Sequence, residues 1–157
     1  VKNYEEDASA MTRIATWKAG INMFKEHPVI GVGAGNFNEM FLYYRPSDIP
    51  YGGQGVSIHN MFLQIFSETG SLGGGLFVLV IAASFISIYR LNRRNRKLPK
   101  NKRLNLSMPN ALRVSLLGFC GAGVFLPGAY YSYIYILFPL IMASKKIYSD
   151  KLKVLKV

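Results

Sequence analysis

Two cationic side chains in the first half of the chain, Arg13 and His59, have the residue types best suited to chemistry on a phosphorylated substrate. The guanidinium of an arginine stays charged at any working pH and can donate two parallel hydrogen bonds to phosphate oxygens. A histidine at the start of a helix meets a positive partial charge, which disfavours protonation and leaves the imidazole able to act as a base or hydrogen-bond donor. The simpler interpretations are a solvated or headgroup-facing Arg13 and a capping or interfacial His59.

Other candidate groups point to structure and not to chemistry. The sequence GVGAG at residues 31–35 lacks both the GK[ST] ending and the preceding strand of a phosphate-binding loop, so it predicts a tight turn that lets the backbone approach another segment. Glu68 is expected to be an interfacial or helix-end carboxylate, and the lone Cys120 a small core residue. Residues 1–70 contain no cluster of metal-ligand residues and no DxD pair, and we expect neither a metal nor a cofactor.

Two helices are predicted to position Arg13 and His59. The first begins near Asp7 or Ser9 and runs to about Lys25, because apolar residues recur at intervals of three and four and because a residue before proline avoids helical geometry. Its predicted apolar face consists of Ala10, Ile14, Trp17, Ile21 and Phe24. The second helix is expected to begin near Ser57, so that His59 lies in its first turn.

The distribution of charge indicates a membrane protein. The formal charge is +11, but residues 1–70 hold five basic and seven acidic residues, whereas 71–157 hold fourteen basic residues and one acid. Residues 71–89 are uncharged, and as a helix they span about 28 Å, close to the hydrocarbon thickness of a bilayer. Residues 90–103 hold eight Lys or Arg and no acid, which predicts a cytoplasmic location and puts residues 1–70 on the outer face. Basic clusters that border apolar runs argue against nucleic-acid binding.

The last apolar stretch, residues 111–144, is too long for one ordinary span and has basic residues on both sides. Pro127-Gly128 divides it, so we expect a helical hairpin of about 112–126 and 129–144, with a re-entrant pair as the alternative. Tyr130 and the neighbouring tyrosines are expected near the outer interface. The predicted organisation is an outer-face loop domain at 1–70, a membrane helix at 71–89, a basic cytoplasmic loop at 90–110, a membrane hairpin at 111–144 and a basic tail at 145–157.

The fold class predicted from these features is all-α, a multispanning membrane protein fragment with about three C-terminal membrane helices. Because the chain opens with Val1 and not Met, we expect a further portion upstream.

The order of three motifs resembles the C-terminal half of the O-antigen ligase and polymerase superfamily. The motifs are SAMTRIATW at 9–17, HPVIGVGAGNF at 27–37 and HNMFLQIFSETG at 59–70, followed by a membrane span. The variant most similar is the O-glycosylation ligase associated with exosortase systems, which shares YEEDASAM at 4–11, YRP at 44–46 and the region 113–133. The family's histidine, ten residues, then glycine pattern is met by His59 and Gly70. Its arginine, three residues, then leucine pattern is met only in part, since Trp17 stands at the leucine position.

The resemblance implies a GT-C-like glycosyltransferase on the outer face of the bacterial inner membrane. Such enzymes move a glycan from an undecaprenyl-diphosphate carrier to an acceptor hydroxyl. The family's functional arginine and histidine map onto Arg13 and His59, and we expect Arg13, Trp17, Arg45 and Asn60 to contact substrate. The implied partners are the lipid-linked donor, a glycan, lipid or protein acceptor, and membrane lipid.

Two alternatives remain open at this point. A polysaccharide polymerase of the same superfamily would use the same donor and extend a growing chain. A non-catalytic transporter or membrane scaffold would have no need of Arg13 and His59 in one site, so the placement of these two residues distinguishes it from an enzyme.

Overall fold

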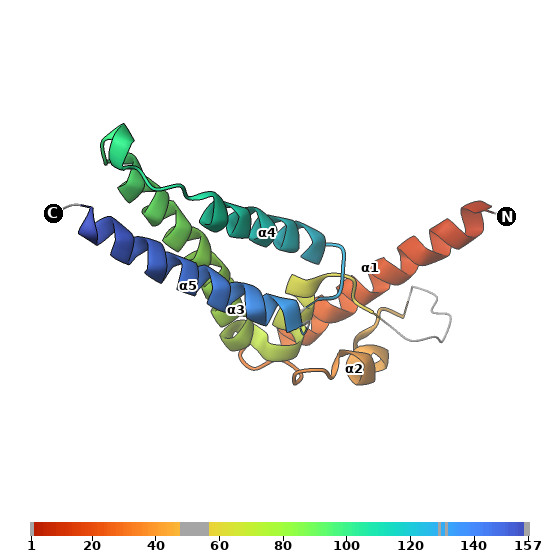
Figure 1. Ribbon diagram of the computed structural model, residues 1–157. Helices are drawn as coiled ribbons and strands as arrows, with labels where there is room; N and C mark the ends of the chain where they lie inside the picture. Colours follow the sequence, from red (N-terminus) through yellow and green to blue (C-terminus); the bar gives the residue numbers. More distant parts are fainter. Residues whose placement is uncertain (1, 48–56, 129, 131, 156–157) are drawn as a thin grey trace. The chain divides into compact units, whose positions relative to one another are not determined.

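The structure is a computed structural model that describes residues 2–47, 57–128, 130 and 132–155 (Figure 1). Its helices are α1 (Lys2–Glu26), α2 (Phe37–Tyr44), α3 (Met61–Arg96), the 3-10 helix η1 (Lys100–Lys102), α4 (Ser107–Gly123) and α5 (Ser132–Val154). The described part of the chain contains no strand, so the all-α prediction is confirmed there. The chain divides into two compact units, Val1–Phe77 with Ala122–Tyr130, and Val78–Gly121 with Tyr131–Val157.

In the first unit, α1 packs through its small side chains. Its buried residues include Ala15, Ala19 and Met23, which lie one turn apart and join Phe37, Phe41 and Ile58 in one core cluster. The buried residues coincide only in part with the predicted apolar face of α1, since Ala10 is exposed and Ile14 and Ile21 are 45% and 43% exposed. The reason is close approach: a Cβ added at Gly20 would lie 2.8 Å from the Ile58 side chain. Only small residues let α1 come so near to the segment before α3.

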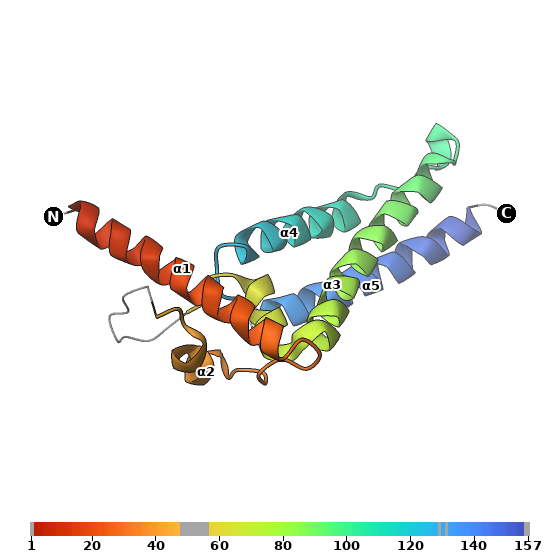
Figure 2. The ribbon, with the colours of Figure 1, turned by 180° about the vertical axis from the view of Figure 1, so that it is seen from behind.

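Helix α3 is broken at Gly70, whose φ of 64° and ψ of −162° are nonhelical. In an unbroken helix the N–H groups of Ser71 and Leu72 would donate to the carbonyls of Ser67 and Glu68. Here all four groups form hydrogen bonds with the loop after α1, which lies beside the start of α3 (Figure 2). The four bonds are Val32 N to Ser67 O (3.0 Å), Gly33 N to Glu68 O (2.9 Å), Ser71 N to Pro28 O (2.8 Å) and Leu72 N to Val29 O (3.2 Å). The break therefore leaves none of these four groups unsatisfied.

Two glycines make this backbone-to-backbone contact possible. A Cβ at Gly70 would lie 2.3 Å from the carbonyl oxygen of Val29, and a Cβ at Gly31 would lie 2.3 Å from the backbone carbonyl carbon of Glu68. Both residues also have positive φ, at 64° and 68°. The expectation that GVGAG is a tight turn approaching another segment is thus met at its first residue, Gly31, and the partner segment is the break in α3.

The second unit contains the continuation of α3 with α4 and α5. Ile88, Leu116 and Ile141, one from each helix, form a buried cluster, and Leu91, Leu98, Leu106 and Leu152 form another. Between α3 and α4, the buried side chain of Asn95 binds both the N–H and the C=O of Leu104, at 2.9 and 2.8 Å. This contact fixes the connection in which η1 lies.

Among the described residues, one helix, Met61–Arg96, is long and apolar enough to cross a membrane. It continues through the basic residues 90–96, which the sequence placed in a loop. Helices α4 and α5 lie on either side of Pro127-Gly128, but α4 spans 107–123 and not 112–126, and α5 spans 132–154 and so continues into the predicted basic tail. Their crossing of a membrane and the domain limits given above remain predictions.

Candidate functional site

A hydrogen bond from Trp17 connects α1 to the segment that carries His59. The indole Nε1 of Trp17 donates to the carbonyl oxygen of Ile58 at 2.8 Å. Arg13 lies one turn before Trp17 on the same side of α1, and residues four apart on a helix are neighbours. His59 directly follows Ile58 in the chain. The bond therefore joins the two segments that carry Arg13 and His59.

His59 has the only positive φ among the described non-glycine residues, 45°. The left-handed conformation is strained for most side chains, and such outliers are enriched at functional sites. Helix α3 begins at Met61, not near Ser57, because Asn60 is its N-cap: the Oδ1 of Asn60 accepts a hydrogen bond from the N–H of Leu63 at 2.9 Å. His59 thus lies just before the helix and not in its first turn. Its half-buried imidazole has no hydrogen bond to the described residues.

Arg13 is exposed, and its guanidinium has no ion pair or hydrogen bond to the described side chains. Its backbone carbonyl accepts a hydrogen bond from the Thr16 hydroxyl at 2.8 Å, a local bond within α1. The side chain of Trp17 is half-buried against the core of the first unit. Arg13 is therefore a residue of α1 whose cationic end is exposed to solvent.

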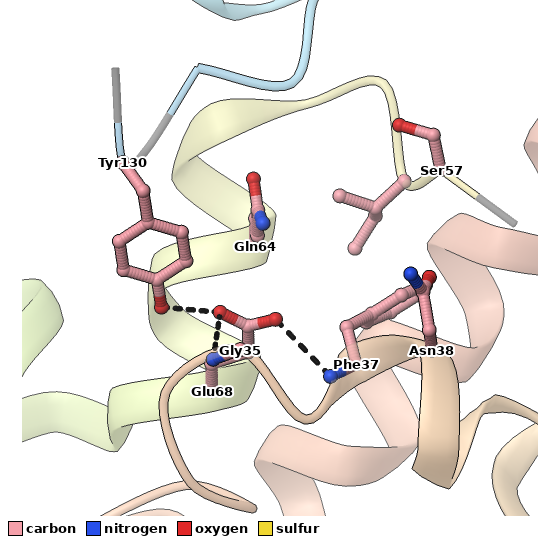
Figure 3. Close-up of a pocket in the computed structure, with 8 residues that line it drawn as sticks. Gly35, Phe37, Asn38, Ser57, Gln64, Glu68 and Tyr130 are labelled. Carbon is pink, nitrogen blue, oxygen red and sulfur yellow. Dashed lines mark hydrogen bonds between the residues drawn. The ribbon is translucent and has the colours of Figure 1, made fainter. Parts of the chain in front are cut away.

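Glu68 is a buried residue of α3 whose carboxylate binds the loop that follows α1 (Figure 3). Its side chain is 1% exposed. Its Oε1 accepts a hydrogen bond from the N–H of Phe37 at 3.1 Å, and its Oε2 accepts one from the N–H of Gly35 at 3.1 Å and another from the Tyr130 hydroxyl. Three donors thus compensate the burial of one carboxylate. Glu68 fixes the end of the glycine-rich loop and the start of α2.

Sequence reasoning missed the role of Glu68 and that of its partner Tyr130. The signal available was that Glu68 is the only charged residue between Asp48 and Arg90. A lone carboxylate in an apolar segment is costly unless it is hydrogen-bonded, so it predicts a buried acceptor with dedicated donors. The donors themselves come from residues 31 to 33 positions earlier and 62 positions later, which no local pattern indicates.

A small cavity of about 120 Å³ lies beside Glu68. Figure 3 shows the amide of Gln64 and the ring of Tyr130 around it. The Oε1 atom of Gln64 is buried and has no hydrogen-bond partner among the described residues. The complete lining is Gly35, Phe37, Asn38, Ser57, Ile58, Gln64, Glu68 and Tyr130. The cavity reaches Ser57 and Ile58, next to His59, but neither Arg13 nor His59 lines it.

We expect Glu68→Gln to destabilise the first unit by about 2–3 kcal/mol. The amide keeps one acceptor oxygen, but its NH₂ group faces a donor, and hydrogen bonds to a charged group contribute about 1.5–3 kcal/mol. The measurement is the thermal unfolding midpoint of the full-length protein in detergent. Glu39→Gln, in the exposed first turn of α2, is the control and is expected to unfold close to wild type. Equal midpoints for both variants would contradict the role assigned to Glu68.

Arg45 lies at the end of α2, where its N–H donates to the Phe41 carbonyl at 2.9 Å. The preceding residue, Tyr44, joins α2 to α1: its carbonyl accepts a hydrogen bond from Asn22 and its hydroxyl contacts His27 Nε2. The pKa of the Tyr44 phenol is raised by burial, and then by the charge of Glu26 and a hydrogen bond to it. Arg45 thus lies at the C-terminal end of α2, whereas Arg13 and His59 belong to the two segments that the Trp17–Ile58 hydrogen bond joins.

Among the described residues no group of three His, Cys, Asp or Glu side chains is arranged to hold a metal ion.

Residues 1–78 match the family model Wzy_C, described as O-antigen ligase. No curated protein and no solved structure matches the chain. The match supports the superfamily indicated by the sequence motifs, and with it a ligase- or polymerase-type membrane enzyme of the glycosyltransferase kind. The matched segment contains Arg13, His59 and Gly70.

Proposed function

We propose that the protein transfers a glycan from an undecaprenyl-diphosphate carrier to an acceptor hydroxyl at the outer face of the bacterial inner membrane. The observation that carries the proposal is the Trp17–Ile58 hydrogen bond, which joins the helix of Arg13 to the segment of His59 within the family-matched region. A scaffold has no need of this arrangement, because it gains nothing from an unpaired arginine and a strained histidine on either side of one contact.

The reaction breaks the bond between the anomeric carbon and the diphosphate oxygen and forms one between that carbon and the acceptor oxygen. The diphosphate leaves with the bonding electron pair, so negative charge develops on its oxygens. A fixed guanidinium stabilises that charge without a proton transfer. In this proposal the free end of Arg13 holds the diphosphate by two parallel hydrogen bonds.

The acceptor hydroxyl loses its proton as it attacks. In this proposal His59 takes that proton or donates a hydrogen bond to the same diphosphate. The unpartnered ring of His59 supports this role, since neither nitrogen is engaged by a described residue.

The other predicted substrate contacts take different parts in the proposal. Trp17 uses its indole N–H on Ile58, so it holds the site together and offers only its ring to a substrate. Asn60 uses its Oδ1 as the cap of α3 and has its NH₂ group left for a sugar hydroxyl. Arg45, at the end of α2, would meet a more distant part of the glycan. The exosortase-associated subtype and the GT-C-like arrangement of the membrane helices belong to the proposal as well.

The experiment is a transfer assay with the full-length protein in vesicles and a lipid-linked oligosaccharide. We expect product with an undecaprenyl-diphosphate donor and a loss of at least about a hundredfold with the matching monophosphate donor, because a monophosphate offers a poorer leaving group and fewer oxygens to Arg13. Equal rates with both donors would contradict the diphosphate proposal. Offering a lipid acceptor and a growing glycan in parallel separates ligase from polymerase.

A further inference from the structure

A cationic pocket lies between α3 and α5 in the second unit. It has a volume of about 110 Å³ and is lined by Ser87, Arg90, Leu91, Arg94, Lys145 and Ser149. Arg90 and Arg94 are one turn apart on α3, and Lys145 and Ser149 are one turn apart on α5, so each pair shares a helix face. Helices α3 and α5 therefore line this pocket with three cationic side chains and two hydroxyl groups.

No carboxylate of this unit can compensate these charges. The only acidic side chain in residues 71–157 is Asp150, and its Oδ1 is bound to Nζ of Lys153 at 2.9 Å. Arg90, Arg94 and Lys145 have no ion pair or hydrogen bond to the described residues. Like charges held close together repel, and an anion from outside the chain removes that repulsion. A bound anion would therefore lower the electrostatic energy of these three side chains.

The position of the pocket indicates where that anion comes from. Arg90 is the first charged residue after the uncharged run 71–89, and Lys145 is the first after the uncharged run 114–144. If these apolar runs lie in hydrocarbon, the first charges beyond them lie at the level of the lipid headgroups. Basic pockets between membrane helices bind anionic headgroups at that level.

We propose that this pocket binds the phosphate group of an anionic glycerophospholipid. The arginines donate forked hydrogen bonds to phosphate oxygens, and Lys145 adds a point charge. The hydroxyl of Ser87, which is 7% exposed, adds a buried donor. The cavity of about 110 Å³ is large enough to admit a phosphate group. The proposal does not depend on the glycan-transfer activity.

The test measures binding of phosphatidylglycerol to the full-length protein in nonionic detergent, from the shift of its unfolding midpoint with lipid concentration. The triple variant Arg90→Gln, Arg94→Gln, Lys145→Gln is expected to bind roughly a hundredfold more weakly, since each basic residue near an anionic surface contributes about fivefold. Arg94→Gln alone is expected to lose about fivefold, which keeps the test valid if the triple variant does not fold. Binding should weaken as salt is raised.

The matched control is the triple variant Lys97→Gln, Lys100→Gln, Lys102→Gln, which removes the same charge from exposed residues outside the pocket. We expect it to bind phosphatidylglycerol within a few-fold of wild type. Equal losses in the two triple variants would show a diffuse charge effect and overturn the pocket. Equal stabilisation by phosphatidylcholine would overturn the anionic headgroup, and equal stabilisation by inorganic phosphate would overturn the lipid source.

Discussion

Arg13→Lys is expected to lose nearly as much glycan transfer as Arg13→Ala. Lysine keeps the charge but cannot reproduce the planar, two-point fork on the diphosphate. Losing one such donor in the transition state costs about 3–4 kcal/mol, or roughly a hundredfold to a thousandfold in rate. His59→Ala is expected to cause a similar loss. The measurement is transfer from the lipid-linked donor in membranes that hold equal amounts of each full-length variant.

The structure indicates two control variants, Lys18→Ala and His59→Asn. Lys18 is exposed on α1 next to Trp17, and Lys18→Ala should transfer at nearly the wild-type rate. Because His59 has a positive φ, a loss in His59→Ala combines chemistry with backbone strain. Asparagine tolerates the left-handed conformation and still forms hydrogen bonds, but it cannot take a proton. His59→Asn retaining substantial transfer would indicate hydrogen bonding to the diphosphate, and His59→Asn as poor as His59→Ala would indicate proton transfer.

Gly70→Ala is expected to disrupt the first unit and with it the whole site. A Cβ there would lie 2.3 Å from the Val29 carbonyl oxygen, in contact with backbone that cannot move aside without breaking the bonds between the loop and α3. The conformation itself, φ 64° and ψ −162°, is essentially restricted to glycine and costs about 1–3 kcal/mol for other residues. Together with the clash we expect a loss of about 3 kcal/mol or more in stability.

Gly75→Ala is the matched control for Gly70→Ala. Gly75 lies in the same helix, has no positive φ, and a Cβ there meets nothing within 4 Å. Because alanine favours helix by about 1 kcal/mol over glycine, its midpoint should equal or exceed that of wild type. The unfolding midpoint of each full-length variant in detergent is the measurement. A Gly70→Ala midpoint equal to that of Gly75→Ala would contradict the account of the break in α3.

Two helices, α1 and α3, could be predicted in part because their signals are local, whereas α2 (Phe37–Tyr44) was not predicted and α1 begins at Lys2 and not near Asp7 or Ser9. Periodic apolar residues and His27-Pro28 predicted α1 to within a few residues of its end, and the uncharged run 71–89 predicted the middle of α3. The buried face of α1 could not be predicted, because it depends on which neighbour approaches. Ile58 comes close enough to require a small residue at Gly20, and Ala15, Ala19 and Met23 are buried while Ile14 and Ile21 are exposed.

The site could be predicted only in its residue types. The motifs selected Arg13 and His59, but the Trp17–Ile58 bond that joins their segments spans 41 residues and has no sequence signature. The start of α3 was placed too early, since Ser57 and Asn60 are both good caps and only the structure shows that Asn60 is used. Glu68 was misjudged for a similar reason, because its three donors are distant in the chain.

If Arg13 and His59 serve one site, a double-mutant cycle on glycan transfer should show strong coupling between them. Rates are compared for the full-length wild type, Arg13→Ala, His59→Ala and the double variant, at equal protein levels in membranes. Groups that act as a unit have strongly non-additive effects. We expect the double variant to be about as slow as the slower single variant. A loss equal to the product of the two single losses would mean independent sites and would contradict this expectation.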